Sequence, residues 1–348
     1  MLINFISKIT SIQRDTMIAR EMDVIKTEIL HLRGGIALLD KRMTLKEAVS
    51  KYVFDGCSMN IASICAREPL AVAHEIIRQG RKNITYITDT TTDPVELLVA
   101  AGCFNRIEAA YIWIGVVGQG YNIRRAVEQG IPNHIEMIPY SNYSAGLRLM
   151  AGAMGLPFMP TKSLLGSDII KYNPDIKVID DPYGTGPIAL VPAATPDVTF
   201  IHVQRADMAG NCQIWGMLGN DEHAAKASKN VVITCEEIVP TSEIRKIPNM
   251  TTIPEYAVSA VVELPFGCHP LSVTGYYWMD NPFRQEFIKA SKSREGILQW
   301  LDEWVYKIDN HEQYLDKVGR ERLAKLQEME QDNCMIPEIT AKTGEGRL

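Results

Sequence analysis

The sequence predicts an α/β fold, in which an open and mostly parallel sheet is flanked by helices and followed by a helical C-terminal region. Short apolar runs alternate with segments of helical periodicity through most of the chain. Glycine or proline stands at most of the boundaries between these segments. The stretch over 283–330 is charged and helical in pattern. Because strands that alternate with helices are typical of parallel sheets covered on both faces, these observations favour this fold class.

The first helix is expected to begin after Thr44. In the run TLKE, the Thr44 hydroxyl caps the start of the helix while Glu47 reaches back to it, which is the pattern of a capping box. Apolar residues recur at helical spacing from Leu45 onwards, and Asp55-Gly56 ends the helix.

The later elements follow in regular order. Helices are expected from Pro69 to Gly80, over 94–101, up to Gly130 and over 141–155. The segment 156–186 is rich in proline and glycine without a clear period, and a connection of this length indicates a functional or interface loop. Strands are expected at 59–64, 83–88, 106–115, 135–139, 187–192, 198–203, 230–235 and 256–264.

Composition narrows the classes of function. Among 348 residues, the charge balance of 36 − 42 = −6 disfavours a nucleic-acid-binding protein, which needs a basic surface. No apolar stretch approaches the ~18 residues of a membrane span, and the first residues do not form a secretory signal. The 7 cysteines are scattered and never form a CxxC pair, which favours a cytoplasmic location and argues against a metal site. We expect an N-terminal extension over 1–40, one α/β domain over 41–330 and a tail over 331–348.

The segment WIGVVGQGYNIRR over 113–125 is the most specific candidate for binding a ligand. Gly118 and Gly120 flank Gln119 where a strand leads into a helix, and such glycines let a ligand approach the backbone. The free N–H groups of the helix start attract an anion, but Arg124 and Arg125 lie in the same turn, where the helix dipole disfavours cations. Two interpretations stay open: a bound anion compensates the arginines, or acidic residues of a neighbouring element pair with them.

Other chemistries find little support in the sequence. The glycine run fails the dinucleotide fingerprint because Ile123 occupies the last glycine position, and Walker A and GxSxG motifs are absent. Glu236 and Glu237 follow a strand and are expected to point in different directions, most simply with structural roles. His202 and His269 flank apolar runs and are expected to be hydrogen-bonded core or interface residues.

Several long segments resemble one enzyme family. They are MTLKEAVSKYVFDG, AVAHEIIRQG, LPFMPTKSLLGSD, VPAATPDVTFIHVQRADMAGNCQIWG, VVITCEEIVPTSEIRKIPN, IPEYAVSAVVELPFGCHPLSVTGYYWMDNPF and EWVYKIDNHEQYLDKVGRERL. Over about residues 43–330 the chain resembles the family I CoA-transferases, and among them the A subunits of the glutaconate CoA-transferase type.

The resemblance implies an open α/β sheet and an activity that moves CoA between acids. In this family a glutamate attacks the acyl-CoA thioester and becomes a glutamyl-CoA thioester, by covalent catalysis. In the subfamily that glutamate belongs to a separate B subunit, so no catalytic residue is assigned to this chain. A hetero-oligomer of α2β2 form or larger is implied, with coenzyme A as substrate, a small dicarboxylic acid as acceptor and no permanently bound cofactor. A hydrolase or ring-opening relative and a non-catalytic small-molecule sensor are the alternatives.

The resemblance also places the expected substrate-binding residues in the glycine loop. The resemblance to the glutaconate CoA-transferase type implies a serine that faces the substrate carboxylate in the loop matching 115–121, and the nearest matching residue here is Gln119. We therefore expect Gly118, Gln119, Gly120 and Arg125 to bind substrate. Relatives also have a GGF turn where this chain reads GCSMNIAS over 56–63, so glutaconate itself is less well supported than the reaction class.

Overall fold

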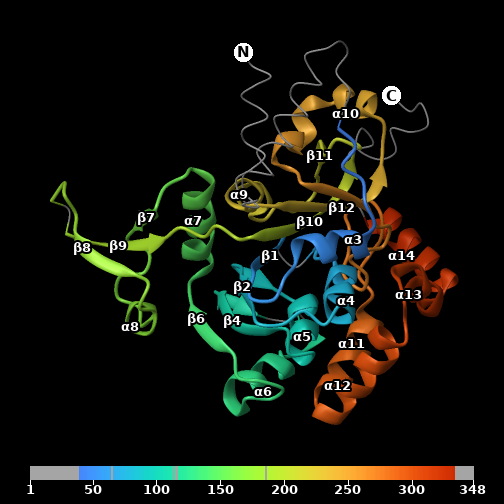
Figure 1. The fold of residues 1–348 in the computed structure, drawn as a ribbon, viewed down its shortest axis with the longest axis horizontal. Coiled ribbons are helices and arrows are strands. Elements are labelled where there is room, and N and C mark those ends of the chain that lie inside the picture. Colours follow the sequence, from blue (N-terminus) through green and yellow to red (C-terminus); the bar gives the residue numbers. More distant parts are fainter. Residues whose placement is uncertain (1–38, 64–65, 113, 115–116, 185, 334–348) are drawn as a thin grey trace, which may run out of the picture. The chain divides into compact units, whose positions relative to one another are not determined.

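The computed structural model describes residues 39–63, 66–112, 114, 117–184 and 186–333. Most of the predicted extension over 1–40, and residues 334–348 of the predicted tail, lie outside the described residues. The large sheet has nine strands among these residues, and its parallel strands follow the order β14-β12-β10-β1-β2-β4-β6 (Figure 1). These strands are Ala260–Glu263 (β14), Val231–Ile238 (β12), Val198–Ala206 (β10), Ser58–Ala62 (β1), Ile84–Ile87 (β2), Phe104–Ala109 (β4) and Glu136–Pro139 (β6).

Two short strands extend the large sheet, and two other strands pair with each other outside it. Cys212–Gln213 (β11) pairs with β10 and with Thr251–Ile253 (β13) in antiparallel fashion. Thr90–Thr91 (β3) pairs in parallel with Tyr111–Ile112 (β5), outside the large sheet. The single strand predicted over 106–115 is therefore wrong in its second half: β4 ends at Ala109, and β5 follows as part of a different sheet.

Helices cover both faces of the large sheet. The first face carries Leu45–Tyr52 (α3), Leu70–Arg78 (α4), Asp93–Ala100 (α5), Tyr121–Gln129 (α6), Asn281–Ser291 (α11) and Arg294–Leu301 (α12). The other face carries Asn142–Ala153 (α7) and Asp221–Ala227 (α9). Strand β10 is buried at every position, which fits a central parallel strand with helices on both sides.

The local signals for helix ends are confirmed. Thr44 caps α3, and its side chain and that of Glu47 form both hydrogen bonds of the capping box. Gly130 ends α6 in the left-handed conformation with φ of 71°, where glycine carries no steric penalty. The C-terminal region is helical as expected, with Asp302–Tyr306 (η4), His311–Val318 (α13) and Arg320–Asn333 (α14) after α12. Smaller helices are Ile169–Tyr172 (α8), Thr241–Lys246 (α10), Pro248–Met250 (η2) and Glu255–Ala257 (η3).

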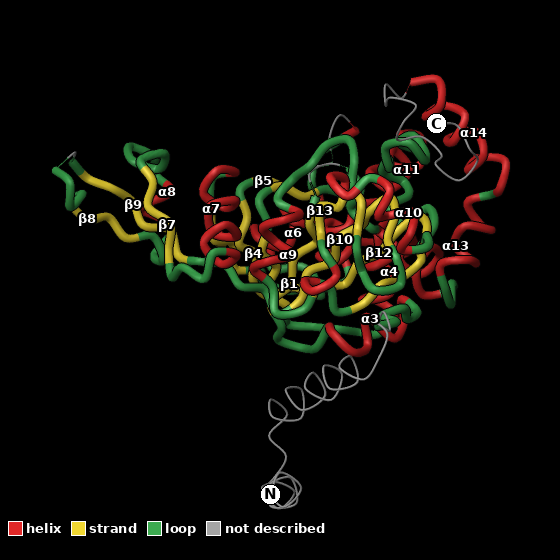
Figure 2. The backbone as a smooth tube through the Cα atoms, turned by 90° about the horizontal axis from the view of Figure 1, so that it is seen from above, coloured by secondary structure: helices red, strands yellow, loops and turns green. Residues whose placement is uncertain are grey.

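The segment over 156–186 differs from the irregular loop that the sequence predicts. It contains Phe158–Thr161 (β7), α8 and Lys177–Asp180 (β8), and the two strands flank Pro187–Pro192 (β9) in an antiparallel sheet of order β7-β9-β8. We call residues 156–192 the arm; it extends beyond β6 and α7, away from the other parallel strands (Figures 1 and 2). The strand β9 was predicted, but β7 and β8 have four residues each, and their proline and charged residues hide the alternation in the sequence.

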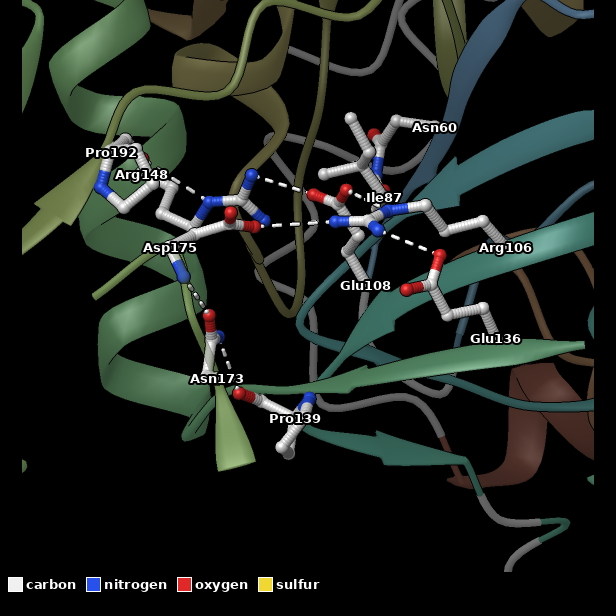
Figure 3. A network of polar contacts seen from close by, with 10 residues as sticks. All are labelled: Asn60, Ile87, Arg106, Glu108, Glu136, Pro139, Arg148, Asn173, Asp175 and Pro192. Atoms are coloured by element: carbon white, nitrogen blue, oxygen red, sulfur yellow. Dashed lines mark hydrogen bonds and ion pairs between the residues drawn. The ribbon is translucent and has the colours of Figure 1, made fainter. Parts of the chain in front are cut away.

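An ion-pair network joins the arm to the large sheet (Figure 3). Arg106 on β4 pairs with Glu108 at 2.7 Å and with Asp175 of the arm at 3.2 Å. Arg148 on α7 pairs with the other oxygen of Glu108 at 2.6 Å and donates from Nε to the Pro192 carbonyl at 3.2 Å. Because two arginines share one carboxylate, the base of the arm is fixed by several bonds that support one another.

Candidate functional site

The carboxyl ends of the parallel strands meet at one edge of the large sheet, and this edge is where open α/β sheets bind ligands. Four connections gather there. They are the described parts of the loop after β1, the segment Thr88–Asp93 after β2, the glycine loop before α6, and the start of α7.

The segment after β2 is polar and yet buried. Its sequence is TDTTTD, from Thr88 to Asp93, and every residue in it is buried. Glu68, from the loop after β1, accepts hydrogen bonds at 3.0 Å from the Thr91 hydroxyl and from the Thr92 N–H. The sequence reasoning did not select these residues, although three threonines between two aspartates at a strand end were a visible signal.

Two further contacts connect neighbouring loops at this edge. Asn220, just before α9, donates to Asp89 at 2.6 Å, and burial raises the pKa of the Asp89 carboxyl above its usual value. Thr90 donates to the side-chain oxygen of Asn142 at the start of α7. Loops from three strand–helix units are thus connected by side-chain hydrogen bonds.

The loop after β1 is fixed by a buried ion pair. Arg67 pairs with Asp221 at 3.2 Å, and the Arg67 guanidinium also donates to the carbonyls of His202 and Met217. Arg67 and Ser63 have positive φ values, of 55° and 126°, which residues other than glycine rarely adopt. Backbone strain of this kind persists only where surrounding contacts hold it, and it is common around functional sites.

The helix after the glycine loop has an acidic partner within the chain. Gly120 occupies the N-cap of α6 and gives no side-chain cap, while Glu96 on α5 accepts from the Asn122 N–H at 2.8 Å and from the Ile123 N–H at 2.9 Å. Glu96 is fully buried, and burial raises the pKa of its carboxyl to about 7. An internal carboxylate therefore occupies the position where the sequence suggested a bound anion.

The two arginines of α6 are also engaged within the chain. Arg124 pairs with Glu128, one turn later on its own helix, at 2.9 Å. Arg125 donates to the Asn122 side chain at 3.0 Å and to the carbonyl of Ser291, the last residue of α11, at 2.8 Å. The Arg125 cation thus lies at the negative end of another helix dipole, which removes the conflict noted in the sequence. Contact between Arg125 and a substrate stays a prediction.

Gln119 is the most accessible residue of the glycine loop. Its side chain is exposed and has no hydrogen bond to any part of the chain that the structure describes. Gly118 and Gly120 have tight surroundings: a Cβ atom at Gly118 would lie 2.8 Å from Ile288 Cγ2, and one at Gly120 would lie 2.8 Å from Glu96 Oε1. The roles of Gly118, Gln119 and Gly120 in substrate binding stay predictions.

Comparison with known proteins identifies the family. The profile described as Coenzyme A transferase matches residues 42–264. The chain belongs to this family. It is 37% identical over 279 residues to the A subunit of 3-oxoadipate CoA-transferase from Pseudomonas knackmussii, covering 80% of this chain and 98% of that protein. It is 40% identical over 300 residues to a protein of Archaeoglobus fulgidus without an assigned function, covering 84% of this chain and 66% of that protein.

A solved structure supports the same assignment. The chain is 33% identical over 306 residues to the A subunit of glutaconate CoA-transferase from Acidaminococcus fermentans, covering 83% of this chain and 95% of that protein. The crystal structure of glutaconate CoA-transferase from that organism matches this fold with a TM-score of 0.79 over 82% of this chain and 95% of the other. The chain is thus a CoA-transferase subunit of the A type, and CoA-transferases use CoA thioesters as substrates.

In this CoA-transferase subunit, three of the four residues judged structural from the sequence are buried: His202, His269 and Glu236. His202 is buried between Thr234 and Glu236, at 2.9 and 2.8 Å. His269 is bonded to Tyr314 and Asp280. Glu236 is buried while Glu237 is exposed, which confirms that neighbouring strand residues point to opposite sides.

Neither a metal cluster nor a membrane segment is found in the part of the chain that the structure describes. No group of three or more His, Cys, Asp or Glu side chains there could hold a metal ion. None of the helices within those ranges is long and apolar enough to cross a membrane.

Proposed function

We propose that this chain is the A-type component of a heteromeric CoA-transferase that moves CoA from an acyl-CoA to a small dicarboxylic acid of the glutaconate type. A B-type partner supplies the glutamate nucleophile, and the two chains form an α2β2 or larger assembly in the cytoplasm. The observation that carries the proposal is that five buried carboxylates at this edge already accept hydrogen bonds from the chain itself: Glu68, Asp89, Asp93, Glu96 and Asp221.

A carboxylate that attacks a thioester has to approach the acyl carbon with a free oxygen. Side chains held by buried N–H, hydroxyl or guanidinium donors are poor candidates, because leaving their partners would cost several buried hydrogen bonds. The division of labour in the proposal follows: the partner's glutamate attacks the acyl-CoA carbonyl and forms an anhydride while the CoA thiolate leaves. The thiolate then attacks the glutamyl carbonyl and releases the first acid, and the second acid repeats these steps in reverse.

This chain's part in the reaction is to hold the acid. We assign the acid's non-reacting carboxylate to the exposed amide of Gln119 between the two glycines, with Arg125 beside the same helix start. An amide N–H donates to a carboxylate, and the glycines let the backbone come close to it. No atom of this chain bonds covalently to the substrate in this scheme.

The experiment is to produce the chain together with the B-type protein and to follow CoA transfer from acetyl-CoA to a panel of dicarboxylic acids. We expect transfer by the complex, and none by the chain alone or by a complex whose partner has its glutamate changed to glutamine. Turnover by the chain alone would overturn the proposal. Hydrolysis of acetyl-CoA to acetate and free CoA, without formation of a CoA thioester of the acceptor acid, would overturn the assignment as a transferase.

A variant of Gln119 tests the acid site. We expect Gln119→Ala in the complex to reduce the preference for dicarboxylic over monocarboxylic acceptors by about 1–3 kcal/mol, because one hydrogen bond to a charged group is lost. The matched control is Arg124→Gln, which removes an exposed surface ion pair on the adjoining helix. An unchanged acceptor profile would show that Gln119 does not contact the acid.

A further inference from the structure

Buried charged side chains hold the backbone on both sides of Gly118–Gly120, at Ile114 and at the start of α6. Before the glycines, Arg284 on α11 donates to the Ile114 carbonyl at 2.8 Å and holds Asp93 in a two-fold contact at 2.9 Å. After the glycines, Glu96 accepts the Asn122 and Ile123 N–H groups. Asp93 and Glu96 lie one turn apart on α5: Glu96 contacts the start of α6 directly, and Asp93 pairs with the Arg284 side chain that contacts Ile114.

The end held by Glu96 is also tightly packed. A Cβ atom at Gly120 would lie 2.8 Å from Glu96 Oε1 and 2.8 Å from Ile123 Cγ2, so the loop backbone rests directly on the carboxylate. Asn122 donates to the Ser291 hydroxyl, and Arg125 donates to the Ser291 carbonyl, which fixes the first turn of α6 against α11. These contacts fix the backbone from Gly120 to Ile123.

We infer that Glu96 is a positioning residue of the acid site: its carboxylate sets where the backbone of Gly120 lies, and thereby where Gln119 meets the acceptor acid. The inference rests on the proposed function of the loop. Glu96 touches no substrate and acts through the two N–H groups that it holds. Because the acid's non-reacting carboxylate is bound alike before and during the reaction, a displaced loop weakens binding without slowing the chemical step.

The deciding variant is Glu96→Gln in the complex with the B-type partner. The amide has nearly the same size, but one of its two ends is a donor and faces a backbone N–H that also donates. We expect the KM for glutaconate to rise about tenfold, since a displacement of a fraction of an ångström is enough to misplace a binding group. The kcat and the KM for acetyl-CoA should stay within about twofold, because in the proposed scheme the loop binds only the acceptor acid.

A second readout does not depend on activity. Hydrogen exchange at the amides of Asn122 and Ile123 should become faster in Glu96→Gln, because these two N–H groups lose their acceptor. Gly120→Ala should have the same two effects, since its new Cβ displaces the Glu96 carboxylate. The double variant should be no worse than the more severe single one, because both changes disturb the same contact.

The control is Asp197→Asn at the opposite edge of the sheet. Asp197 also accepts a backbone N–H, that of Ser58 at 2.9 Å, just before β10 begins. This variant should lose stability without changing the KM for glutaconate or the exchange at α6. Unchanged exchange in Glu96→Gln would show that the carboxylate does not hold the loop. Faster exchange with an unchanged KM would overturn the positioning role. If the unaltered complex transfers CoA to no acid, the proposed function itself fails, and the exchange measurement still tests the contact.

Discussion

The carboxyl edge of the large sheet and the arm differ in which side chains they bury and which they expose to solvent. At the edge, polar groups from distant parts of the chain are buried and bonded to one another, as Glu68 is to Thr91 and Thr92. In the arm, large apolar side chains lie in water, with Tyr172 72% and Tyr183 90% exposed. Buried polar contacts define one geometry because each missing partner is costly, whereas exposed apolar groups constrain little. The edge is therefore expected to be sensitive to single substitutions, and the surface of the arm tolerant of them.

The largest effect is expected at the buried Arg284–Asp93 pair of the edge. Both side chains are 2% exposed, and Arg284→Met would leave the Asp93 charge without its partner. The free energy of unfolding should fall by about 3–5 kcal/mol, measured by urea denaturation. The double variant Arg284→Met with Asp93→Leu should recover a large part of the loss. A loss below about 1 kcal/mol in Arg284→Met would contradict the expectation that the carboxyl edge is more sensitive to substitution than the surface of the arm.

A pH dependence of about 3 kcal/mol is expected from Glu96. Burial raises the pKa of this carboxyl from its usual 4.5 to about 7, so the folded chain keeps a proton that the unfolded chain has lost. The contribution of Glu96 to stability is therefore greatest below about pH 4.5 and declines as the pH rises towards 7. The difference in unfolding free energy between the unaltered chain and Glu96→Gln should decrease over this range. A difference independent of pH would show that the group does not titrate there.

The network at the base of the arm should give a smaller effect. Glu108→Gln weakens two charge-assisted bonds, to Arg106 and Arg148, but leaves the shape of the side chain unchanged. We expect a loss of about 1–2 kcal/mol and faster proteolytic cleavage within the arm. Arg124→Gln is the control, because its ion pair is exposed to water. Unaltered cleavage of the arm would argue that α7 packing alone holds it.

The smallest effect is expected on the exposed surface of the arm. Tyr183→Ser and Ile179→Thr replace side chains that are 90% and 45% exposed, and each should change the unfolding free energy by less than about 0.5 kcal/mol. Ala189→Asp is the matched contrast, because Ala189 lies on β9 but is fully buried. A loss above about 1 kcal/mol at Tyr183 would show that the exposed surface is also constrained.

What the sequence determined by itself was local. Thr44 and Glu47 are three residues apart, and Gly130 follows directly on the helix that it ends, so these signals predicted helix ends and the alternation that gives the fold class. The family was also recognisable, because long segments of chain carry the resemblance. The glycine loop was correctly placed between a strand and a helix, but the partners of its charges were not predictable.

Only the tertiary structure decided which charges meet. Glu96 lies 26 residues from the helix start that it caps, and Arg284 lies 191 residues from Asp93. The arm followed the same rule, because the four-residue strands β7 and β8 become stable only when they pair with β9, whose Ala189 and Val191 are buried in the same cluster as residues of α7. Periodicity and capping act over one or two turns of chain, whereas the partner of a buried charge is set by packing between elements. For that reason the sequence indicated where a site could lie, and the folded chain determined which side chains remain free to serve it.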